Sequence, residues 1–327
     1  MKFSRHRLLR LAAGAVALPI LPRLARAQAY PTRPVTLIVP FPAGGGADVI
    51  ARVMAERMRE PLGQPIIIEN IAGADGSIGV GRAARVRPDG YTICLGFDGS
   101  HVLNGAFFSL PYDLFNDFVP ISPLATISIV LLARKTMPAQ GLSELIAWLK
   151  AHPNQASAGI NNLTFRLLAV RLQKQTGTQF TIVPYRAVGS VLGDLVASQI
   201  DLSFNTVAVS LPLVRSESIK AYAVTGETRS KLAPDIPTFA QMGLPDLTYT
   251  SWYGFFAPKG TPNDIIRKLS GTAVEALADP AVRSRLAELG YEAFPRERQT
   301  PEMLAALQKS HAEKWWPIIK EFGIKAE

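Results

Sequence analysis

The sequence has very few of the residues from which metal and nucleophilic sites are usually built. It contains one cysteine, Cys94, and four histidines in 327 residues. A single cysteine cannot form an internal disulfide, and Cys94 lies inside the apolar run YTICLGF, so we expect a buried thiol. No spacing of His and Cys matches a zinc pattern or a metalloprotease helix. We therefore predict no metal and no other cofactor.

The N-terminal segment also lacks an apolar run long enough to cross a membrane. Its run from Leu11 to Leu21 has eleven residues, whereas a spanning helix needs about 20. A basic stretch precedes the run, and the small-x-small triplet Ala25-Arg26-Ala27 follows it, which is the pattern of a secretory signal. We predict a signal peptide over residues 1–27, cleavage after Ala27 and a periplasmic mature protein. The string SRHRLLR leaves open whether export is general or twin-arginine.

The mature chain has no strong excess of either charge. The whole sequence carries a net charge of +9, but six of its 35 basic residues and none of its 26 acidic residues lie in residues 1–27. Removing that segment leaves 29 basic against 26 acidic residues, a net charge of +3. No basic run or aromatic-basic stripe remains, so we expect no nucleic-acid partner.

Strands and helices alternate along the mature chain. Apolar strands are predicted at 34–40, 65–70 and 91–97, with an amphipathic helix at 47–60 that we expect Pro61 to end. This rhythm predicts an α/β fold with a mainly parallel sheet. Helices are expected near the C-terminus at 262–278, 280–289 and 301–322.

Two internal similarities predict two related lobes. Residues 36–54 resemble residues 180–200, and residues 128–150 resemble residues 252–274. Strands near 125–133 and 249–257 would cross between the lobes. The predicted lobes are residues 28–128 plus 250–327, and residues 129–249. Because ligands of α/β sheets bind at the carboxyl ends of strands, we expect the site in the cleft between the lobes.

The stretch PFPAGGGAD (40–48) predicts an anion-binding turn between a strand and a helix. It is not a P-loop, because no Gly-Lys-Ser/Thr follows the glycines, and it lacks the GxGxxG order of a dinucleotide fingerprint. Backbone N–H groups at a helix N-terminus suit a smaller anion such as a carboxylate. Asp48 either caps the helix, the simpler interpretation, or contacts the ligand. Phe41 and Tyr185, which follow the two Ile-Val-Pro strands, either line the cleft or pack beneath it.

Catalytic motifs are absent from the sequence. The nearest string to a GxSxG elbow, DGSIG at 75–79, has Asp in place of the first glycine. In DGSH at 98–101, Ser100 and His101 are neighbours, and we expect neighbouring side chains to face apart. The sequence therefore favours a binding protein over an enzyme. A carboxylate-processing hydrolase or isomerase in the same cleft is the alternative of another class.

Several blocks in order resemble the substrate-binding proteins of tripartite tricarboxylate transporters, the Bug family. The blocks are YPTRPVTLIVPFPAGGGADVIAR (30–52), IIIENIAGADGSIGVGRAARVRPDGYT (66–92), PYDLFNDFVPISPL (111–124), VPYRAVGSVLGDLVASQIDLSF (183–204), AVTGETRSKLAPDIPTFAQMG (223–243) and WYGFFAPKGTP (252–262). The resemblance implies a non-enzymatic, two-lobed Venus flytrap with a double crossover that binds small carboxylates. It also implies delivery to membrane transporter subunits, or to a periplasmic sensor, and we expect a monomer.

The resemblance also implies ligand contacts. The first loop would grip a carboxylate through the N–H groups of Ala43 to Gly46. A second, Gly-Ser-rich turn of the family is replaced by SAGINNLTFRLLA (157–169), with Arg166 at the family's histidine position as a candidate second clamp. The predicted ligand-binding residues are Phe41, Ala43, Gly44, Gly45, Gly46, Asp48, Ser100, Asn161, Asn162, Thr164, Arg166, Tyr185 and Asn205.

Overall fold

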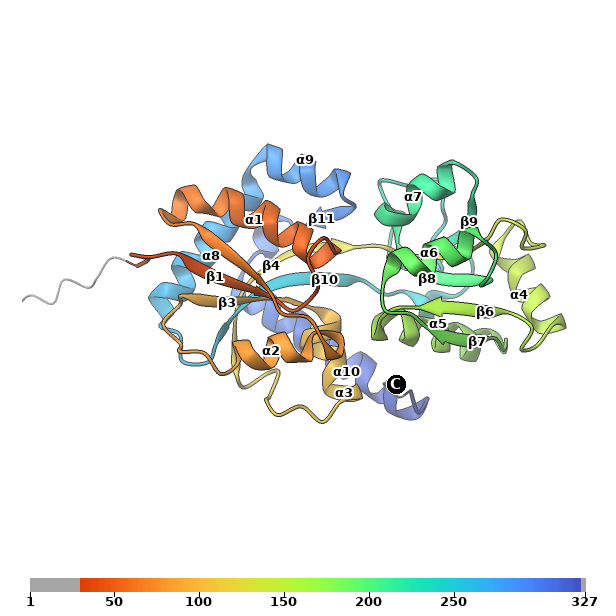
Figure 1. The fold of residues 1–327 in the computed structure, drawn as a ribbon, viewed down its shortest axis with the longest axis horizontal. Helices are drawn as coiled ribbons and strands as arrows, with labels where there is room; N and C mark the ends of the chain where they lie inside the picture. The colour runs from red at the N-terminus through yellow and green to blue at the C-terminus, as the bar shows by residue number, and fades with distance from the viewer. Residues whose placement is uncertain (1–29, 325–327) are drawn as a thin grey trace, which may run out of the picture.

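The computed structural model describes residues 30–324, which form two mixed sheets covered by helices (Figure 1). The six-stranded sheet has the order β11-β4-β10-β3-β1-β2, and with its helices we call it the first lobe. The five-stranded sheet has the order β7-β6-β8-β5-β9, and with its helices we call it the second lobe. The α/β class and the double crossover predicted from the sequence are confirmed. The predicted signal peptide lies outside the described residues.

The first lobe is built from both ends of the chain. Its elements are β1 (Val35–Val39), α1 (Gly46–Leu62), β2 (Ile66–Asn70), η1 (Ala74–Gly76), α2 (Ser77–Ala83), β3 (Thr92–Phe97), η2 (Gly99–Leu103), α3 (Asn104–Phe107), β4 (Phe118–Ile127), β10 (Ser251–Pro258), α8 (Asn263–Ala278), α9 (Pro280–Glu288), β11 (Tyr291–Ala293), η4 (Arg296–Arg298) and α10 (Pro301–Glu321).

The second lobe is one continuous stretch of chain. Its elements are β5 (Ile129–Arg134), α4 (Leu142–Ala151), β6 (Ser157–Ile160), α5 (Leu163–Thr176), β7 (Thr181–Pro184), α6 (Val188–Val196), β8 (Leu202–Thr206), α7 (Val207–Arg215) and β9 (Ile219–Val224). The short helix η3 (Pro245–Leu247) lies on the way back to β10.

Helix α1 shows how the side-chain pattern produces an element. Ile50, Met54 and Met58 repeat every four residues and are fully buried, because that spacing places them on one face. The prediction that Pro61 ends the helix is wrong, since α1 continues to Leu62. Gly63 stops it with a φ of 73°, its N–H donating to the carbonyls of Arg59 and Glu60. A proline in the last turn removes only one hydrogen bond, whereas a left-handed glycine reverses the chain.

The two sheets share one plan of strand pairing. In the first lobe, β1 lies between β2 and β3, all parallel, and β10 is antiparallel to β3 and β4. In the second lobe, β6 lies between β7 and β8, all parallel, and β5 is antiparallel to β8 and β9. The counterparts are therefore β1 and β6, β2 and β7, β3 and β8, and β10 and β5. The antiparallel strands β5 and β10 are those that enter from the other lobe.

This plan corrects one of the two internal similarities. Residues 128–150 and 252–274 contain the counterparts β5 and β10, so that similarity agrees with the topology. Residues 36–54 contain the central strand β1, whereas residues 180–200 contain the edge strand β7. The counterpart of β1 is β6, so the similar strings at residues 36–54 and 180–200 do not mark equivalent strands of the two lobes. A shared Ile-Val-Pro string reflects local strand and turn chemistry, but strand order depends on pairing between distant segments.

One hydrophobic core cluster continues through both lobes. It contains Val102 and Phe256 from the first lobe together with Leu131 and Phe165 from the second. Cys94, as predicted, is a buried member of this cluster, and burial raises the pKa of its thiol. The lobes are thus joined by packed side chains as well as by the two crossing segments.

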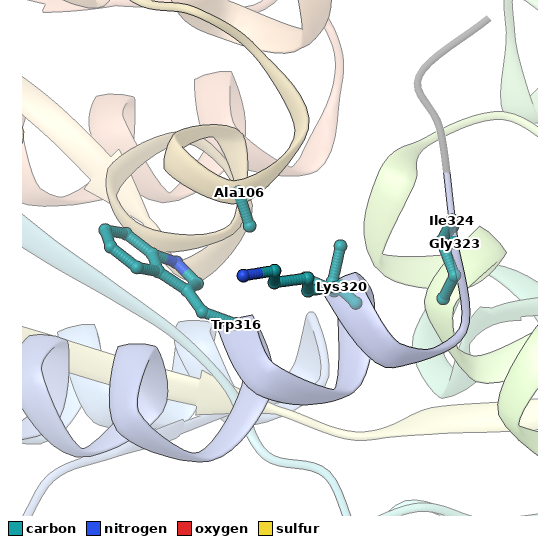
Figure 2. Close-up of a pocket in the computed structure, with 6 residues that line it drawn as sticks. Ala106, Trp316, Lys320, Gly323 and Ile324 are labelled. Carbon is teal, nitrogen blue, oxygen red and sulfur yellow. The ribbon is translucent and has the colours of Figure 1, made fainter.

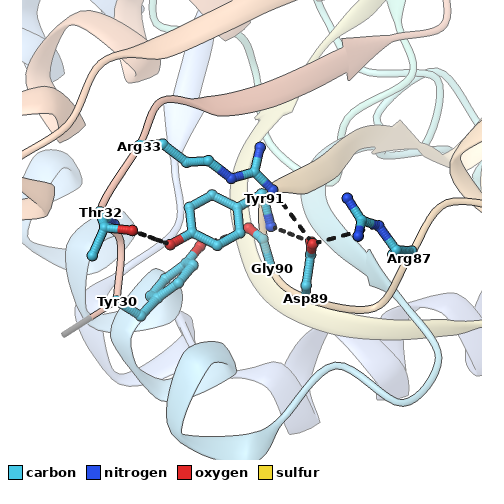
Figure 3. A network of polar contacts seen from close by, with 7 residues as sticks. All are labelled: Tyr30, Thr32, Arg33, Arg87, Asp89, Gly90 and Tyr91. Atoms are coloured by element: carbon cyan, nitrogen blue, oxygen red, sulfur yellow. Dashed lines mark hydrogen bonds and ion pairs between the residues drawn. The ribbon is translucent and has the colours of Figure 1, made fainter. Parts of the chain in front are cut away.

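The start of the described chain is fastened at the amino ends of the first sheet, away from the second lobe (Figures 1 and 3). The Tyr30 hydroxyl donates to the Gly90 carbonyl at 2.6 Å, and Arg33 lies 3.9 Å above the ring of Tyr91. Arg33 also pairs with Asp89 at 3.4 Å.

None of the helices within residues 30–324 has the length and apolar character needed to span a bilayer.

Candidate functional site

The carboxyl ends of the parallel strands in both lobes point toward the crossing strands. In the first lobe, β4 runs in the direction of β1, β2 and β3 and continues through Ser128 into β5. In the second lobe, β5 begins where β6, β8 and β9 end. We call the loops that follow these strands the interlobe edge. Ligands of α/β sheets bind at such an edge.

The glycine loop after β1 presents backbone donors at this edge. Ala43, Gly44 and Gly46 are exposed and Gly45 is half-buried. Gly44 has a φ of 80°, and Gly45 is the N-cap of α1 with no side-chain hydrogen bond. The first N–H groups of a helix have no intrahelical acceptor, so this turn suits an anion.

Two contacts explain why the loop needs glycine and an aromatic residue. A Cβ on Gly46 would lie 2.9 Å from the Tyr291 hydroxyl, which itself donates to the Gly46 carbonyl at 2.7 Å. The half-buried ring of Phe41 packs edge-on against Phe97, with ring centroids 5.2 Å apart. Phe41 therefore has one face on the core and lies at the interlobe edge.

Asp48 holds the glycine loop in place. Its side chain is buried, and its carboxylate accepts hydrogen bonds from Gly44 N at 2.9 Å, Asn70 Nδ2 at 3.0 Å and Arg52 Nε at 2.8 Å. Burial alone would raise the pKa of Asp48, but the hydrogen bonds from Arg52, Gly44 and Asn70 outweigh it and hold the pKa below its usual value. The carboxylate oxygens of Asp48 are thus occupied by hydrogen bonds from the loop and its neighbours. This role resembles the predicted helix cap more than the predicted ligand contact.

The counterpart of the glycine loop in the second lobe is the turn between β6 and α5. Asn162 is the N-cap of α5, and its Oδ1 accepts from Phe165 N at 2.9 Å. Asn161 Oδ1 is buried without a hydrogen-bond partner among residues 30–324. Thr164 is also buried, and its hydroxyl, beside that of Tyr249, makes no hydrogen bond of good geometry within the described chain. Arg166 is half-buried in the first turn of α5.

Two more buried polar atoms lie at the ends of second-lobe strands. Asn205, near the end of β8, is 2% exposed, and its Oδ1 accepts from Thr206 N at 2.8 Å while Nδ2 has no partner in the described part of the chain. Thr225, directly after β9, is fully buried, and its Oγ1 is unpaired there as well. Buried polar atoms are normally hydrogen-bonded, so unpaired ones at a binding edge indicate contacts completed by a ligand or water.

Tyr185 follows the edge strand β7. Its hydroxyl donates to Asp194 at 2.6 Å, and that hydrogen bond raises the pKa of Tyr185 to about 12. Its ring lies over Gly159 of β6, where a Cβ would come within 3.1 Å of it. The hydroxyl is therefore used within the second lobe, and the half-buried ring packs on the sheet.

Ser100 and His101 touch each other, contrary to the expectation that their side chains face apart. Ser100 Oγ lies 3.0 Å from His101 Nδ1 within η2, a π-helical turn, and the local backbone of this turn lets the neighbouring side chains meet. Both residues are fully buried, and the imidazole stacks on Phe256 with centroids 4.3 Å apart. Burial lowers the pKa of His101 to about 3, so the ring stays neutral at physiological pH.

The third member of a hypothetical triad is engaged elsewhere. Asp98 accepts hydrogen bonds from the hydroxyls of Tyr249 and Ser251 and from Trp252 N. It therefore binds the second crossing segment and leaves His101 Nε2 without a partner among the described residues. This geometry does not assemble a nucleophile, base and orienting acid at an accessible position.

Asp75 lies at the interlobe edge, and the sequence interpretation did not single it out. It lies in η1, after the carboxyl end of β2, and its Oδ2 accepts from Leu163 N at the start of α5 at 3.3 Å. It thereby connects the two lobes at the interlobe edge. The sequence did contain a clue to Asp75. It is an acidic residue between glycines in GADG (73–76), shortly after the strand predicted at 65–70.

A separate cavity of about 310 Å³ lies beside α3 and the end of α10 (Figure 2). Its lining is largely apolar, with Lys320 as its charged side chain, and it contains none of the predicted ligand-binding residues.

Within residues 30–324 no cluster of His, Cys, Asp and Glu side chains could hold a metal ion.

Comparison with known proteins agrees with this architecture. Residues 50–324 match the model of the tripartite tricarboxylate transporter family receptor. The periplasmic binding protein BugD is 32% identical, with a TM-score of 0.82 over 91% of this chain and 100% of its own. MatC from Rhodopseudomonas palustris with bound malate is 34% identical, with a TM-score of 0.81 over 89% of this chain and 100% of its own.

A second R. palustris structure, Rpa4515 with adipate, is 31% identical, with a TM-score of 0.82 over 90% of this chain and 99% of that chain. The family match covers most of the chain. The chain therefore belongs to the tripartite tricarboxylate transporter receptor family, together with the Bug-type periplasmic binding proteins.

Proposed function

We propose that this protein captures a small organic carboxylate between its lobes and delivers it to membrane transporter subunits. The observation that carries the proposal is the placement of two helix N-termini, those of α1 and α5, at one edge beside unpaired buried polar atoms. Relatives with bound malate and adipate support the same ligand class. A periplasmic sensor is the alternative recipient of the loaded protein.

In this proposal the ligand's carboxylate sits on the glycine loop. Within the stretch from Ala43 to Gly46, the N–H groups of Ala43 and Gly46 bind it, because the Gly44 N–H donates to Asp48 and the Gly45 N–H faces the Pro42 carbonyl. Asp48 positions the loop without touching the ligand. Asn161, Thr164 and Asn205 contact the rest of the ligand, with Arg166 as a second polar contact. Phe41 and Tyr185 supply apolar walls, and Ser100 supports the loops from the core. Two or three charge-assisted hydrogen bonds at about 1.5–3 kcal/mol each, with some apolar contact, reach the roughly −8 kcal/mol of micromolar binding.

The rest of the proposal concerns the mature protein. We propose cleavage after Ala27, residence in the periplasm as a monomer, and two lobes formed by residues 28–128 plus 250–327 and by residues 129–249. Binding closes the lobes about the two crossing segments. The protein performs no chemistry on its ligand, since the buried Ser100–His101 pair offers no accessible nucleophile.

A thermal-shift screen of mature protein against a panel of carboxylates tests this function. A ligand that binds only the folded state raises Tm, and the shift grows with the logarithm of its concentration relative to Kd. At least one mono- or dicarboxylate is expected to raise Tm at millimolar concentration. No shift with any acid would contradict the proposal.

The variant Gly45→Val tests the location of the site. Gly45 has an ordinary φ of −78°, so the change keeps the backbone but places a branched side chain at the start of α1. Its matched control is Gly141→Val, since Gly141 is likewise a helix N-cap without a side-chain bond, at the start of α4 and beyond the far end of β5. Both variants are expected to lose a similar amount of stability, about 1 kcal/mol, because valine is a poorer N-cap than glycine. Carboxylate affinity should fall at least tenfold in Gly45→Val alone, and equal affinity in both variants would place the ligand elsewhere.

A further inference from the structure

The turn that carries Asp75 is held in an unusual backbone conformation. Ala74 and Asp75 have φ values of 47° and 50°, between Gly73 at 131° and Gly76 at 91°. Left-handed residues other than glycine persist only where their surroundings fix them, and they cluster at functional sites. Here the fully buried Asn104 donates from Nδ2 to the Asp75 carbonyl and to Ser77 Oγ, both at 2.9 Å. Asn104 therefore fixes the backbone of the turn, and the turn in turn fixes the direction of the Asp75 side chain.

That side chain reaches across to the second lobe. Asp75 Oδ2 accepts from Leu163 N, and Leu163 is the first residue of α5. The N–H groups of this first turn are the donors that the second lobe offers to an anion. A carboxylate of the protein itself already takes one of them.

The same turn touches the first-lobe half of the site. A Cβ on Gly76 would lie 3.1 Å from Phe41 Cζ and 3.2 Å from Ser100 Cβ. Asp75 is thus placed between the glycine loop and α5, where the far end of a ligand held by the glycine loop would arrive. Although the residue is partly exposed, its carboxyl group is enclosed, and burial raises the pKa of Asp75 to about 6. At pH 7.5, above that value, the carboxyl group is ionised.

We propose that Asp75 sets the charge of the ligand by taking the place of a second ligand carboxylate at the N-terminus of α5. The inference rests on the proposed function of carboxylate capture. The selected ligand has one carboxylate, bound by the glycine loop, and a hydrogen-bond donor such as an amide, hydroxyl or ammonium group at its other end. The unpaired acceptor Asn161 Oδ1 on the α5 turn fits the same donor. A dicarboxylate would bring its second carboxylate against that of Asp75.

Isosteric pairs of acids test this directly. Succinate is compared with succinamate, and adipate with adipamate, by isothermal titration calorimetry at pH 7.5, using wild type and Asp75→Asn. Asparagine tolerates the left-handed conformation and can donate to a carboxylate, so the variant keeps the turn and reverses its polarity. Asp75→Gly, which also suits a positive φ, is the second variant in case the first does not fold. Asp264→Asn, an exposed acid in the first turn of α8 and remote from the interlobe edge, controls for net charge.

Wild type and Asp264→Asn are expected to bind the monoamide of at least one pair at least tenfold more tightly than the dicarboxylate. Asp75→Asn or Asp75→Gly should raise dicarboxylate affinity at least tenfold and remove that preference. A tenfold preference of wild type for the dicarboxylate, as an Arg166 clamp would produce, overturns the inference while leaving carboxylate capture intact. Equal changes for both acids in the variant also overturn it. If none of these acids, nor any acid of the thermal-shift panel, binds wild type or either variant, the proposed function fails and this inference with it.

Discussion

At the scale of single residues, the first lobe buries the carboxyl group of Asp98 where the chain returns from the second lobe at residues 249–252. Asp98 is fully buried directly after β3, and its three donors all come from residues 249–252, where the chain returns from the second lobe. Desolvation is the largest influence on this carboxyl and raises its pKa to about 6, although the hydrogen bonds from Ser251, Tyr249 and Trp252 act in the opposite direction. Asp98 therefore joins the end of β3 to residues 249–252, and its ionised form is destabilised by burial.

A pH dependence follows from the raised pKa of Asp98. The folded protein binds this proton more tightly than the unfolded chain, so the contribution of Asp98 to stability is full below about pH 4 and is lost as pH rises through about 6. Relative to wild type, Asp98→Asn should be less stable at pH 4, and the deficit should shrink by up to about 3 kcal/mol at pH 7. Urea denaturation at both pH values measures it.

The comparison with the variant is needed because other buried groups act in the opposite sense. Burial lowers the pKa of His101 to about 3 and of His311 to about 4, so their contribution falls as pH falls below about 6.5. Both histidines are present in wild type and in Asp98→Asn, and their effects cancel in the difference. A deficit that is the same at pH 4 and pH 7 would show that Asp98 titrates normally.

At the scale of elements, the glycine loop and α1 form one unit through Asp48. Its carboxylate joins the loop (Gly44 N), the end of β2 (Asn70) and the second turn of α1 (Arg52). The geometry of the glycine loop therefore depends on a buried residue whose carboxylate is bound by the loop, β2 and α1. Sequence pattern alone leaves such a residue ambiguous between a cap and a ligand contact.

Asp48→Ala should loosen this unit. It leaves the Gly44 N–H and the Asn70 amide without their acceptor, which should lower the free energy of unfolding by about 1–3 kcal/mol and carboxylate affinity by roughly tenfold. Arg52→Ala is the control: the Arg52 side chain is 57% exposed, so its loss should lower stability by less than about 1 kcal/mol. Denaturation and calorimetric titration measure both effects. Unchanged affinity in Asp48→Ala would mean that the loop needs no such support.

At the scale of the whole molecule, the two lobes share more than their crossing strands. The core cluster that includes Val102 and Phe256 of the first lobe and Leu131 and Phe165 of the second is continuous. Helix α10 contributes Trp315 to this cluster, although it lies at the other end of the chain. Breaking one lobe would expose apolar surface of the other, so the lobes should not unfold separately.

Unfolding is therefore expected to be a single cooperative transition. Trp148 is in α4 of the second lobe, whereas Trp252, Trp315 and Trp316 are in the first. Urea curves from tryptophan fluorescence of wild type, from fluorescence of Trp148→Phe, and from far-UV circular dichroism should share one midpoint after correction for the variant's own stability. Two separated midpoints would instead describe lobes that unfold independently.

Much of the fold was accessible from sequence because it rests on local patterns. The strands at 34–40, 65–70 and 91–97 and the helices near the C-terminus correspond to β1, β2, β3, α8, α9 and α10 within a few residues. The burial of Cys94 followed from its apolar strand. The binding residues themselves remain predictions, although the structure brings Phe41 and the α5 turn to either side of the turn that carries Asp75.

The sequence by itself determined the elements, the α/β class, the family and the glycine loop, because side-chain periodicity, glycine at positive φ and ordered motif blocks are properties of short segments. The family resemblance already pointed to the 157–169 turn, but only the tertiary structure decided that β6, and not β7, is the topological counterpart of β1, since strand order is set by pairing between distant segments. It also decided that Asp75 crosses to α5 and that Ser100 and His101 are sealed in the core. These features arise from contacts between residues far apart in the chain, or from burial that depends on such contacts.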